Sequence, residues 1–242
     1  MEPTRYLEVI TLESEALAGV VDTHPSLAVP ACPGWRVAEL GRHLGNVHRW
    51  ATLIVSADEI ARVATPEESP FDRDVGPWLR VGAATLVAAL QTAGTDKPVW
   101  TMGLPRTSQF WYRRQAQETT LHRWDAEDAV GITPTAIEPD LAADGVAELL
   151  EMFVPRVHQR SGVTGAGESF HIHRTDGPGE WLVRFEPSGV TVSEEHAKAD
   201  VALRGPAEDL LLMLWRRRPA SSVEVFGSDE MLARWNELVP AI

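Results

Sequence analysis

The spacing of the apolar residues changes near residue 135, and this change constrains the fold more than any other feature of the sequence. Before it, apolar residues recur every three or four positions, which is typical of amphipathic helices. Beyond it, and after one more helical segment, they alternate with polar residues in short runs, which is typical of half-buried strands. A segment with two prolines, residues 132–140, separates the two patterns. We therefore expect two domains, residues 1–135 and 136–242.

The N-terminal part has four segments with helical periodicity, at residues 4–22, 35–58, 75–93 and 109–131. Three prolines and a glycine break the chain between the first two segments, and an acidic loop with prolines follows the second. Gly131 is a typical residue for the C-terminal end of a helix. Four helices of this length predict an up-and-down four-helix bundle.

The C-terminal part combines helix and strand patterns. Residues 141–158 predict a helix, and three alternating runs with short turns between them predict an antiparallel meander at residues 169–174, 180–186 and 189–194. The remaining elements are a strand, a helix, a short strand and a final helix capped by Ser228, expected at residues 201–205, 206–218, 223–227 and 228–239. The predicted fold class is therefore an all-α bundle followed by an α+β domain with a small antiparallel sheet.

The composition excludes several classes of function. The 22 basic and 35 acidic residues give a formal net charge of −13, and the only dense basic run is residues 216–218, so we expect no nucleic-acid partner. The longest apolar run, residues 210–215, has six residues, whereas a membrane-spanning helix needs about 18 or more. The single cysteine, Cys32, cannot form an internal disulfide, and the N-terminus does not resemble a secretory signal. These observations predict a cytoplasmic protein with no membrane partner.

Glu118 and His122 are the most informative pair of polar residues. They lie four residues apart on the predicted fourth helix, so both side chains can reach one metal ion. A third ligand can come from the second helix, which carries His43 and His48. These two histidines point about 140° apart, and His43 is the better candidate because it lies beside the apolar stripe.

The same spacing also allows a simpler interpretation. Arg114 precedes Glu118 by one helical turn and can form a solvated ion pair with it, and Glu39 and His43 show that such pairs arise readily by chance. The chain also lacks the paired Glu-x-x-His motifs of a di-iron bundle. Spacing alone leaves a metal site and a set of ion pairs as alternatives.

Longer segments resemble a known family. VPACPGWRVAELGRHLGNVHRWA and ETTLHRWDAEDA resemble the two signature regions of the mycothiol-dependent maleylpyruvate isomerase family. ADVALRGPAEDLLLMLWRRRP and VEVFGSDEMLARWNELV are similar to the C-terminal domain of that family. The resemblance spans nearly the whole chain and implies a DinB-like four-helix bundle followed by an α+β domain.

The resemblance also implies a site and a chemistry. It assigns a divalent metal, usually zinc, to His43, Glu118 and His122, although nitrogen and oxygen ligands also accept nickel or iron. Three protein ligands leave a zinc position open, and a thiol bound there is activated as its thiolate. The implied function is a metal-dependent isomerase or S-transferase that uses mycothiol as its thiol cosubstrate. In the isomerase, the thiolate adds to a cis double bond, the adduct rotates, and loss of the thiol leaves the trans isomer. The substrate is then a small electrophile such as an unsaturated dicarboxylate.

The resemblance also implies a role for an arginine, and helix spacing suggests one for Asp125. The functional arginine of the family lies at the end of the helix that corresponds to residues 206–218, which makes Arg217 the candidate for binding a substrate carboxylate. Family members often have a glycine before that arginine, where this chain has Arg216, so Arg216 and Arg218 stay as alternatives. The structural alternative is that these basic residues only compensate the negative end of the helix dipole. Asp125 has suitable spacing to orient His122, and an exposed Asp125 is the alternative.

The remaining candidates favour structural roles. Cys32 has no His or Cys partner close in sequence, so we interpret it as a small packing residue rather than a nucleophile. His171 and His173 share the polar face of a predicted strand, and with no third ligand indicated we expect them at the surface. If the chain is not an enzyme, the alternative function is a metal-binding or small-ligand-binding protein of stress response on the same scaffold.

Overall fold

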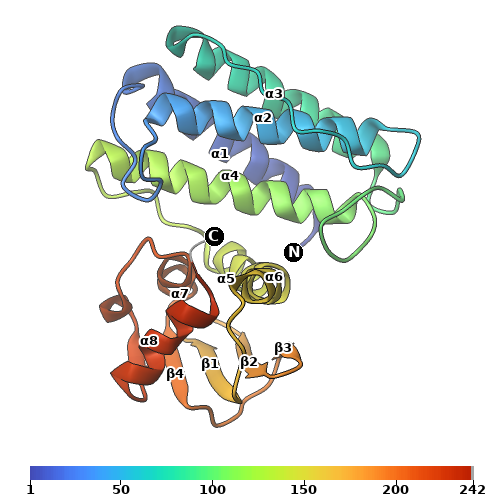
Figure 1. Ribbon diagram of the computed structural model, residues 1–242. Helices are drawn as coiled ribbons and strands as arrows, with labels where there is room; N and C mark the ends of the chain where they lie inside the picture. Colours follow the sequence, from blue (N-terminus) through green and yellow to red (C-terminus); the bar gives the residue numbers. More distant parts are fainter. Residues whose placement is uncertain (241–242) are drawn as a thin grey trace. The chain divides into compact units, whose positions relative to one another are not determined.

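The computed structural model describes residues 1–240 and divides into two compact units, residues 1–135 and 136–242. The first unit contains four long helices, shown in blue to green in Figure 1. They are α1 (Pro3–Thr23), α2 (Val37–Ser56), α3 (Asp72–Ala93) and α4 (Gln109–Val130). The predicted fold class is confirmed, and Gly131 ends α4 with the left-handed backbone, φ 77°, that favours glycine at this position.

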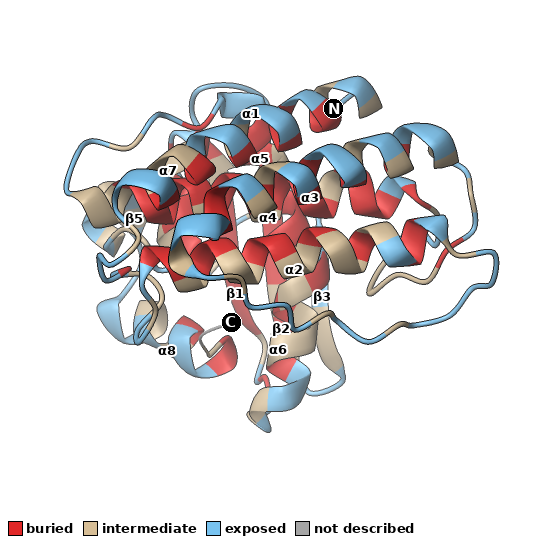
Figure 2. Cartoon of the chain, turned by 90° about the horizontal axis from the view of Figure 1, so that it is seen from above, coloured by how far each residue is buried: buried red, intermediate tan, exposed pale blue. Residues whose placement is uncertain are grey.

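The core of the bundle forms where the apolar stripes of the helices meet. On α2 the stripe includes Leu40, Leu44 and Ile54, all of which are buried. Removing each such side chain from water contributes about 1.5–3 kcal/mol. Figure 2 shows buried and exposed residues alternating along α2 and α3, as the helical period predicts.

The fourth helix differs from its neighbours because it is buried around most of its circumference. Its buried residues include polar side chains such as Gln115, Thr119, Arg123 and Asp125. Burying polar groups is costly unless they find hydrogen-bond or charge partners. This helix supplies two of the three residues with which the candidate site is built.

The second unit begins with a helical run in three parts and continues with a sheet and two further helices. Its helices are α5 (Pro139–Glu148), the π-helical segment η1 (Leu149–Phe153), α6 (Val154–Ser161), α7 (Ala207–Leu214), the short 3-10 helix η2 (Ala220–Ser222) and α8 (Asp229–Leu238). The single helix expected at residues 141–158 contains a π-helical segment that ends at Phe153, two residues before Pro155. Proline has no N–H to donate and crowds the preceding turn, which accounts for the local change in helix type.

The sheet has the strand order β3-β2-β1-β4-β5. Its strands are β1 (Glu168–Arg174), β2 (Glu180–Glu186), β3 (Gly189–Ser193), β4 (Val201–Gly205) and β5 (Glu224–Phe226). The predicted meander of β1, β2 and β3 is antiparallel, but β4 pairs with β1 in parallel, so the sheet is mixed. The sequence pattern identified the strands correctly and did not contain the long-range information that places β4 beside β1.

The helix predicted at residues 206–218 is shorter in the structure, because α7 ends at Leu214. The N–H of Arg217 donates to the carbonyl of Leu212, and the N–H of Arg216 donates to that of Met213. These two bonds form a Schellman motif, and Arg216 adopts its left-handed position with φ 62°. Glycine is the residue that usually fills this position, because it adopts the left-handed backbone without steric cost.

None of the helices within residues 1–240 combines the length and the apolar character needed to cross a membrane.

Candidate metal centre

Side chains from α2 and α4 meet at one carboxylate oxygen. His43 Nε2 lies 3.1 Å from Glu118 Oε1, and His122 Nε2 lies 3.4 Å from the same oxygen. The two imidazole rings are 5.1 Å apart, centroid to centroid. One donor atom from each of the three residues lies within 4.8 Å of the others. The structure therefore brings together the three residues to which the resemblance assigns a metal.

Helix geometry explains this convergence. Glu118 and His122 lie one turn apart on the same face of α4, and α4 packs against α2, which supplies His43. The side chains keep 35%, 21% and 12% of their surface exposed for His43, Glu118 and His122, respectively. The group is thus sheltered within the bundle but open to small molecules on the His43 side.

Glu118 is held as a charged carboxylate. Burial raises its pKa, but Arg114 and hydrogen bonds with His122 and His43 lower it by more, so the pKa lies well below its usual range. Arg114 donates from Nη2 to Glu118 Oε2 at 2.5 Å. The ion pair considered from sequence is therefore present, but it uses the second oxygen and leaves Oε1 facing the two imidazoles.

Asp125 fixes the orientation of His122. Its Oδ2 lies 3.0 Å from His122 Nδ1, and the Asp125 side chain is completely buried. Burial lowers the pKa of His122, while Asp125 and Glu118 raise it by more, to about 9. When His122 is neutral, a proton on Nδ1 shared with Asp125 leaves the lone pair of Nε2 directed toward Glu118 and His43. Of the two positions considered for Asp125, the buried one beside His122 is correct.

The second histidine of α2 lies elsewhere. His48 is completely buried, and its Nε2 lies 3.0 Å from Thr119 Oγ1. Burial lowers the pKa of His48 to about 3, so its imidazole is neutral throughout the physiological range. It packs inside the bundle and does not join the group around Glu118.

Cys32 has a polar neighbour that sequence spacing did not reveal. Its Sγ lies 3.9 Å from Asp125 Oδ2, and 93 residues separate the two in sequence. Cys32, Asp125 and His122 also have donor atoms within 4.8 Å of one another. The loop between α1 and α2 thus places a thiol beside the carboxylate that orients His122.

A surface pocket of about 460 Å³ opens beside His43. It is lined by Arg42, Asn46, Trp50 and residues 65–69 of the following loop, together with His43 itself. Trp35 also packs near His43, with 4.9 Å between the ring centroids. A small molecule in this pocket would contact one member of the group around Glu118.

The candidate arginine lies in the second unit, in the turn after α7. Arg217 donates from Nη1 to the Trp215 carbonyl at 3.0 Å, and its guanidinium lies 5.6 Å from the centre of the Trp215 ring. Arg218 forms ion pairs with Asp209 and with Glu208, the latter at 3.3 Å. Two carboxylates therefore hold Arg218 within its own unit, which makes it the weaker candidate for binding a substrate anion.

Comparison with known proteins agrees with the fold and the order of the domains. The profile of the mycothiol maleylpyruvate isomerase N-terminal domain matches residues 11–127, and that of the MDMPI C-terminal domain matches residues 140–234. The chain belongs to the mycothiol-dependent maleylpyruvate isomerase family. A search of curated proteins found no match.

Two solved structures share the fold over most of both chains. One is described as the crystal structure of the mycothiol-dependent maleylpyruvate isomerase, with a TM-score of 0.61. The other is a histidine-to-alanine mutant described in the same words, with a TM-score of 0.59. Each is 14% identical to this chain, and each match covers 93% of both chains. At this identity the likeness establishes the fold alone.

Proposed function

We propose that this chain is a metal-dependent enzyme that uses a small thiol, mycothiol by family resemblance, to isomerise a small electrophile or to transfer the thiol onto it. His43, Glu118 and His122 would hold the metal. The observation that carries the proposal is the meeting of two imidazole nitrogens and a carboxylate oxygen, from two different helices, around Glu118 Oε1.

The donor set fits a divalent metal such as zinc. Two imidazoles and one carboxylate are a common set of three protein ligands in catalytic zinc sites, which keep a further position for a small molecule. Glu118 is ionised, and the Nε2 atoms of His43 and His122 face it. When bound, the metal would supply Lewis acidity that lowers the pKa of a thiol and favours the nucleophilic thiolate.

The chain supports this chemistry with residues around the ligands. Arg114 restrains one oxygen of Glu118, and Asp125 sets the ring orientation of His122. The pocket beside His43 offers room for the thiol or the substrate. Arg217 is proposed to bind a substrate carboxylate, because a chain with a net charge of −13 otherwise repels an anion.

Metal analysis and a thiol-dependent assay test the proposal together. The purified protein is loaded with Zn²⁺, its metal content is measured, and isomerisation and thiol consumption are followed with unsaturated dicarboxylic acids, with and without mycothiol. We expect turnover that requires both the metal and the thiol. Replacing His122 or Glu118 with alanine should remove the metal from this site and abolish turnover, whereas the exposed His24→Ala variant should behave as the wild type.

Two results would contradict the proposal in different ways. Unchanged metal content in the His122→Ala and Glu118→Ala variants would overturn the ligand assignment. Loss of metal in these variants, combined with no turnover of the acids by the wild type, would leave the ligands in place and overturn the enzymatic function in favour of a binding protein.

A further inference from the structure

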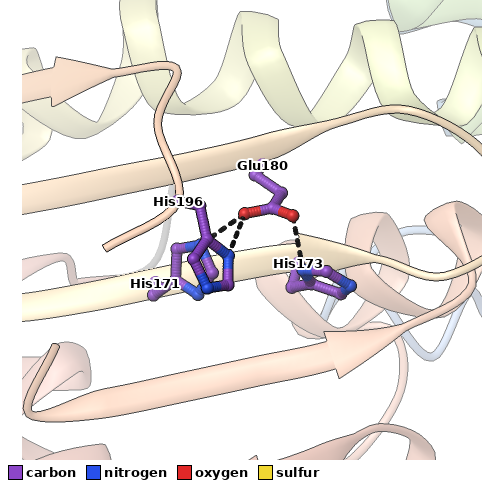
Figure 3. A group of neighbouring side chains, drawn as sticks. All are labelled: His171, His173, Glu180 and His196. Carbon is purple, nitrogen blue, oxygen red and sulfur yellow. Dashed lines mark hydrogen bonds and ion pairs between the residues drawn. The ribbon is translucent and has the colours of Figure 1, made fainter. Parts of the chain in front are cut away.

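The C-terminal unit contains another group of side chains of the types that bind metals, shown in Figure 3. Glu180 lies among three histidines. Its Oε2 is 2.6 Å from His196 Nδ1 and 3.3 Å from His171 Nε2, and its Oε1 is 3.0 Å from His173 Nδ1. One donor atom from each of the four residues lies within 4.8 Å of all the others. Three imidazoles around one carboxylate are a richer donor set than the group in the bundle.

The sheet topology explains how these residues meet. His171 and His173 are two residues apart on β1, so both side chains point to the same face. In the antiparallel register of β1 and β2, His173 is directly opposite Glu180, which places the carboxylate on that face too. The segment between β3 and β4 returns across the sheet and brings His196 to Glu180.

His171 differs from an ordinary surface histidine. Only 5% of the residue is exposed, and its Nε2 atom is buried with no hydrogen-bond partner among the described residues, since the contact with Glu180 lacks hydrogen-bond geometry. Leaving a buried polar atom unsatisfied is unfavourable. A bound metal ion would give this nitrogen the partner that the protein does not supply. The expectation that His171 lies at the surface is therefore wrong, because Glu180 and the segment carrying His196 gather around it.

Ion pairing is a weaker explanation for the arrangement. Ion pairs at a protein surface contribute little, and the side chain of His196 is 80% exposed yet lies against Glu180.

We propose that His171, His173, Glu180 and His196 form a second binding site for a divalent transition-metal ion, with Zn²⁺ as the best fit to three nitrogens and one oxygen. This proposal does not depend on the function proposed for the bundle. In a tetrahedral zinc site the donor atoms lie about 3.3 Å apart. Small side-chain rotations would bring the four donor atoms, now within 4.8 Å of one another, to that spacing. Four protein ligands leave no open position, which makes the site structural rather than catalytic.

The proposed consequence is a metal clamp on the sheet. His171, His173 and Glu180 are fixed on paired strands, whereas His196 belongs to the segment that connects β3 to β4. A metal ion shared by all four would fasten that segment to the sheet. Because it binds the folded arrangement, it would also raise the melting temperature of the protein.

Calorimetric titration with Zn²⁺ alone tests this site in the full chain. We expect two equivalents for the wild type, one for His173→Ala/His196→Ala, one for His43→Ala/His122→Ala, and none for the variant with all four replacements. The equivalent that remains in His43→Ala/His122→Ala should have a Kd below about 1 µM. His171 is left unchanged because its replacement would disturb a buried position.

The controls separate failure of this proposal from failure of the bundle site and from misfolding. Far-UV circular dichroism and the metal-free melting temperature of His173→Ala/His196→Ala should match those of the wild type, and zinc should raise the melting temperature less in that variant. The second site would be overturned by an unchanged zinc stoichiometry in His173→Ala/His196→Ala. It would also be overturned if His43→Ala/His122→Ala bound zinc only with a Kd above about 1 µM. Neither result would bear on His43 and His122.

Discussion

The two groups of histidine and glutamate side chains are built differently, one on helices and one on a sheet. In the bundle, Arg114 and Asp125 hold the candidate ligands Glu118 and His122 from outside the group. In the sheet, Glu180 is contacted by the histidines themselves. The two proposed sites therefore differ in ligand number: three ligands in the bundle leave a position for a small molecule, whereas four ligands in the sheet fill a tetrahedral coordination shell.

The largest expected effect concerns pH at the bundle site. Because the pKa of His122 is about 9 in the metal-free protein, a metal ion must displace a proton from His122 at lower pH. The affinity for Zn²⁺ at this site should therefore rise about tenfold per pH unit, or roughly 100-fold from pH 6 to pH 8. Titration of His173→Ala/His196→Ala against a competing chelator measures this dependence. An affinity that does not change with pH would contradict the role given to His122.

The next effect distinguishes a supporting residue from its neighbour. Replacing Asp125 with asparagine should weaken zinc binding in the bundle by about 10–100-fold, because His122 loses the carboxylate that orients its ring. The matched control is Asp128→Asn, one turn away on α4 at a partly exposed position. Equal losses of affinity in both variants would show that Asp125 acts only through the general charge of the helix.

A third prediction concerns the histidine of α2 that stays outside the group. The pKa of His48 is about 3 in the folded protein and close to the ordinary 6.5 when unfolded, so the unfolded state binds more protons between these values. The wild type should lose stability relative to His48→Gln as the pH falls below 6.5, by about 1.4 kcal/mol per pH unit. Urea unfolding of both proteins at pH 7, 6 and 5 measures this. Parallel curves would show that His48 does not titrate in this way.

The smallest expected effect tests the turn that carries Arg217. Arg216→Gly should be more stable than Arg216→Ala by about 1 kcal/mol, because glycine adopts the left-handed backbone without steric cost. Both variants lose the contact from Arg216 to the Val239 carbonyl, so their comparison isolates the backbone term. Thermal unfolding of the two variants measures the difference, and equal melting temperatures would count against strain at this position.

Sequence patterns predicted the elements well where the determinants are local. The start of α4 at Gln109 and its end before Gly131 follow from helical period and a C-terminal glycine. The parallel pairing of β1 with β4 and the early end of α7 were missed, because the first depends on long-range register and the second on the left-handed Arg216. Propensity and spacing contain neither kind of information.

The candidate sites show the same difference between local and long-range determinants. Glu118 and His122 are visible as an i,i+4 pair, but choosing His43 as their partner required the orientation of α2 and the resemblance to a family. Glu180 and His196 were not connected with His171, because strand pairing and a returning segment bring them together. A site on one helix face can be found by counting residues, whereas a site across strands needs the register.

We propose above that side chains from α2 and α4 hold one cation between them. Anomalous diffraction at the zinc absorption edge, from crystals of the zinc-loaded protein, tests it most directly. We expect a peak at about 2.0–2.2 Å from His43 Nε2, a Glu118 oxygen and His122 Nε2. Zinc bound elsewhere, with these three side chains directed apart, would contradict it.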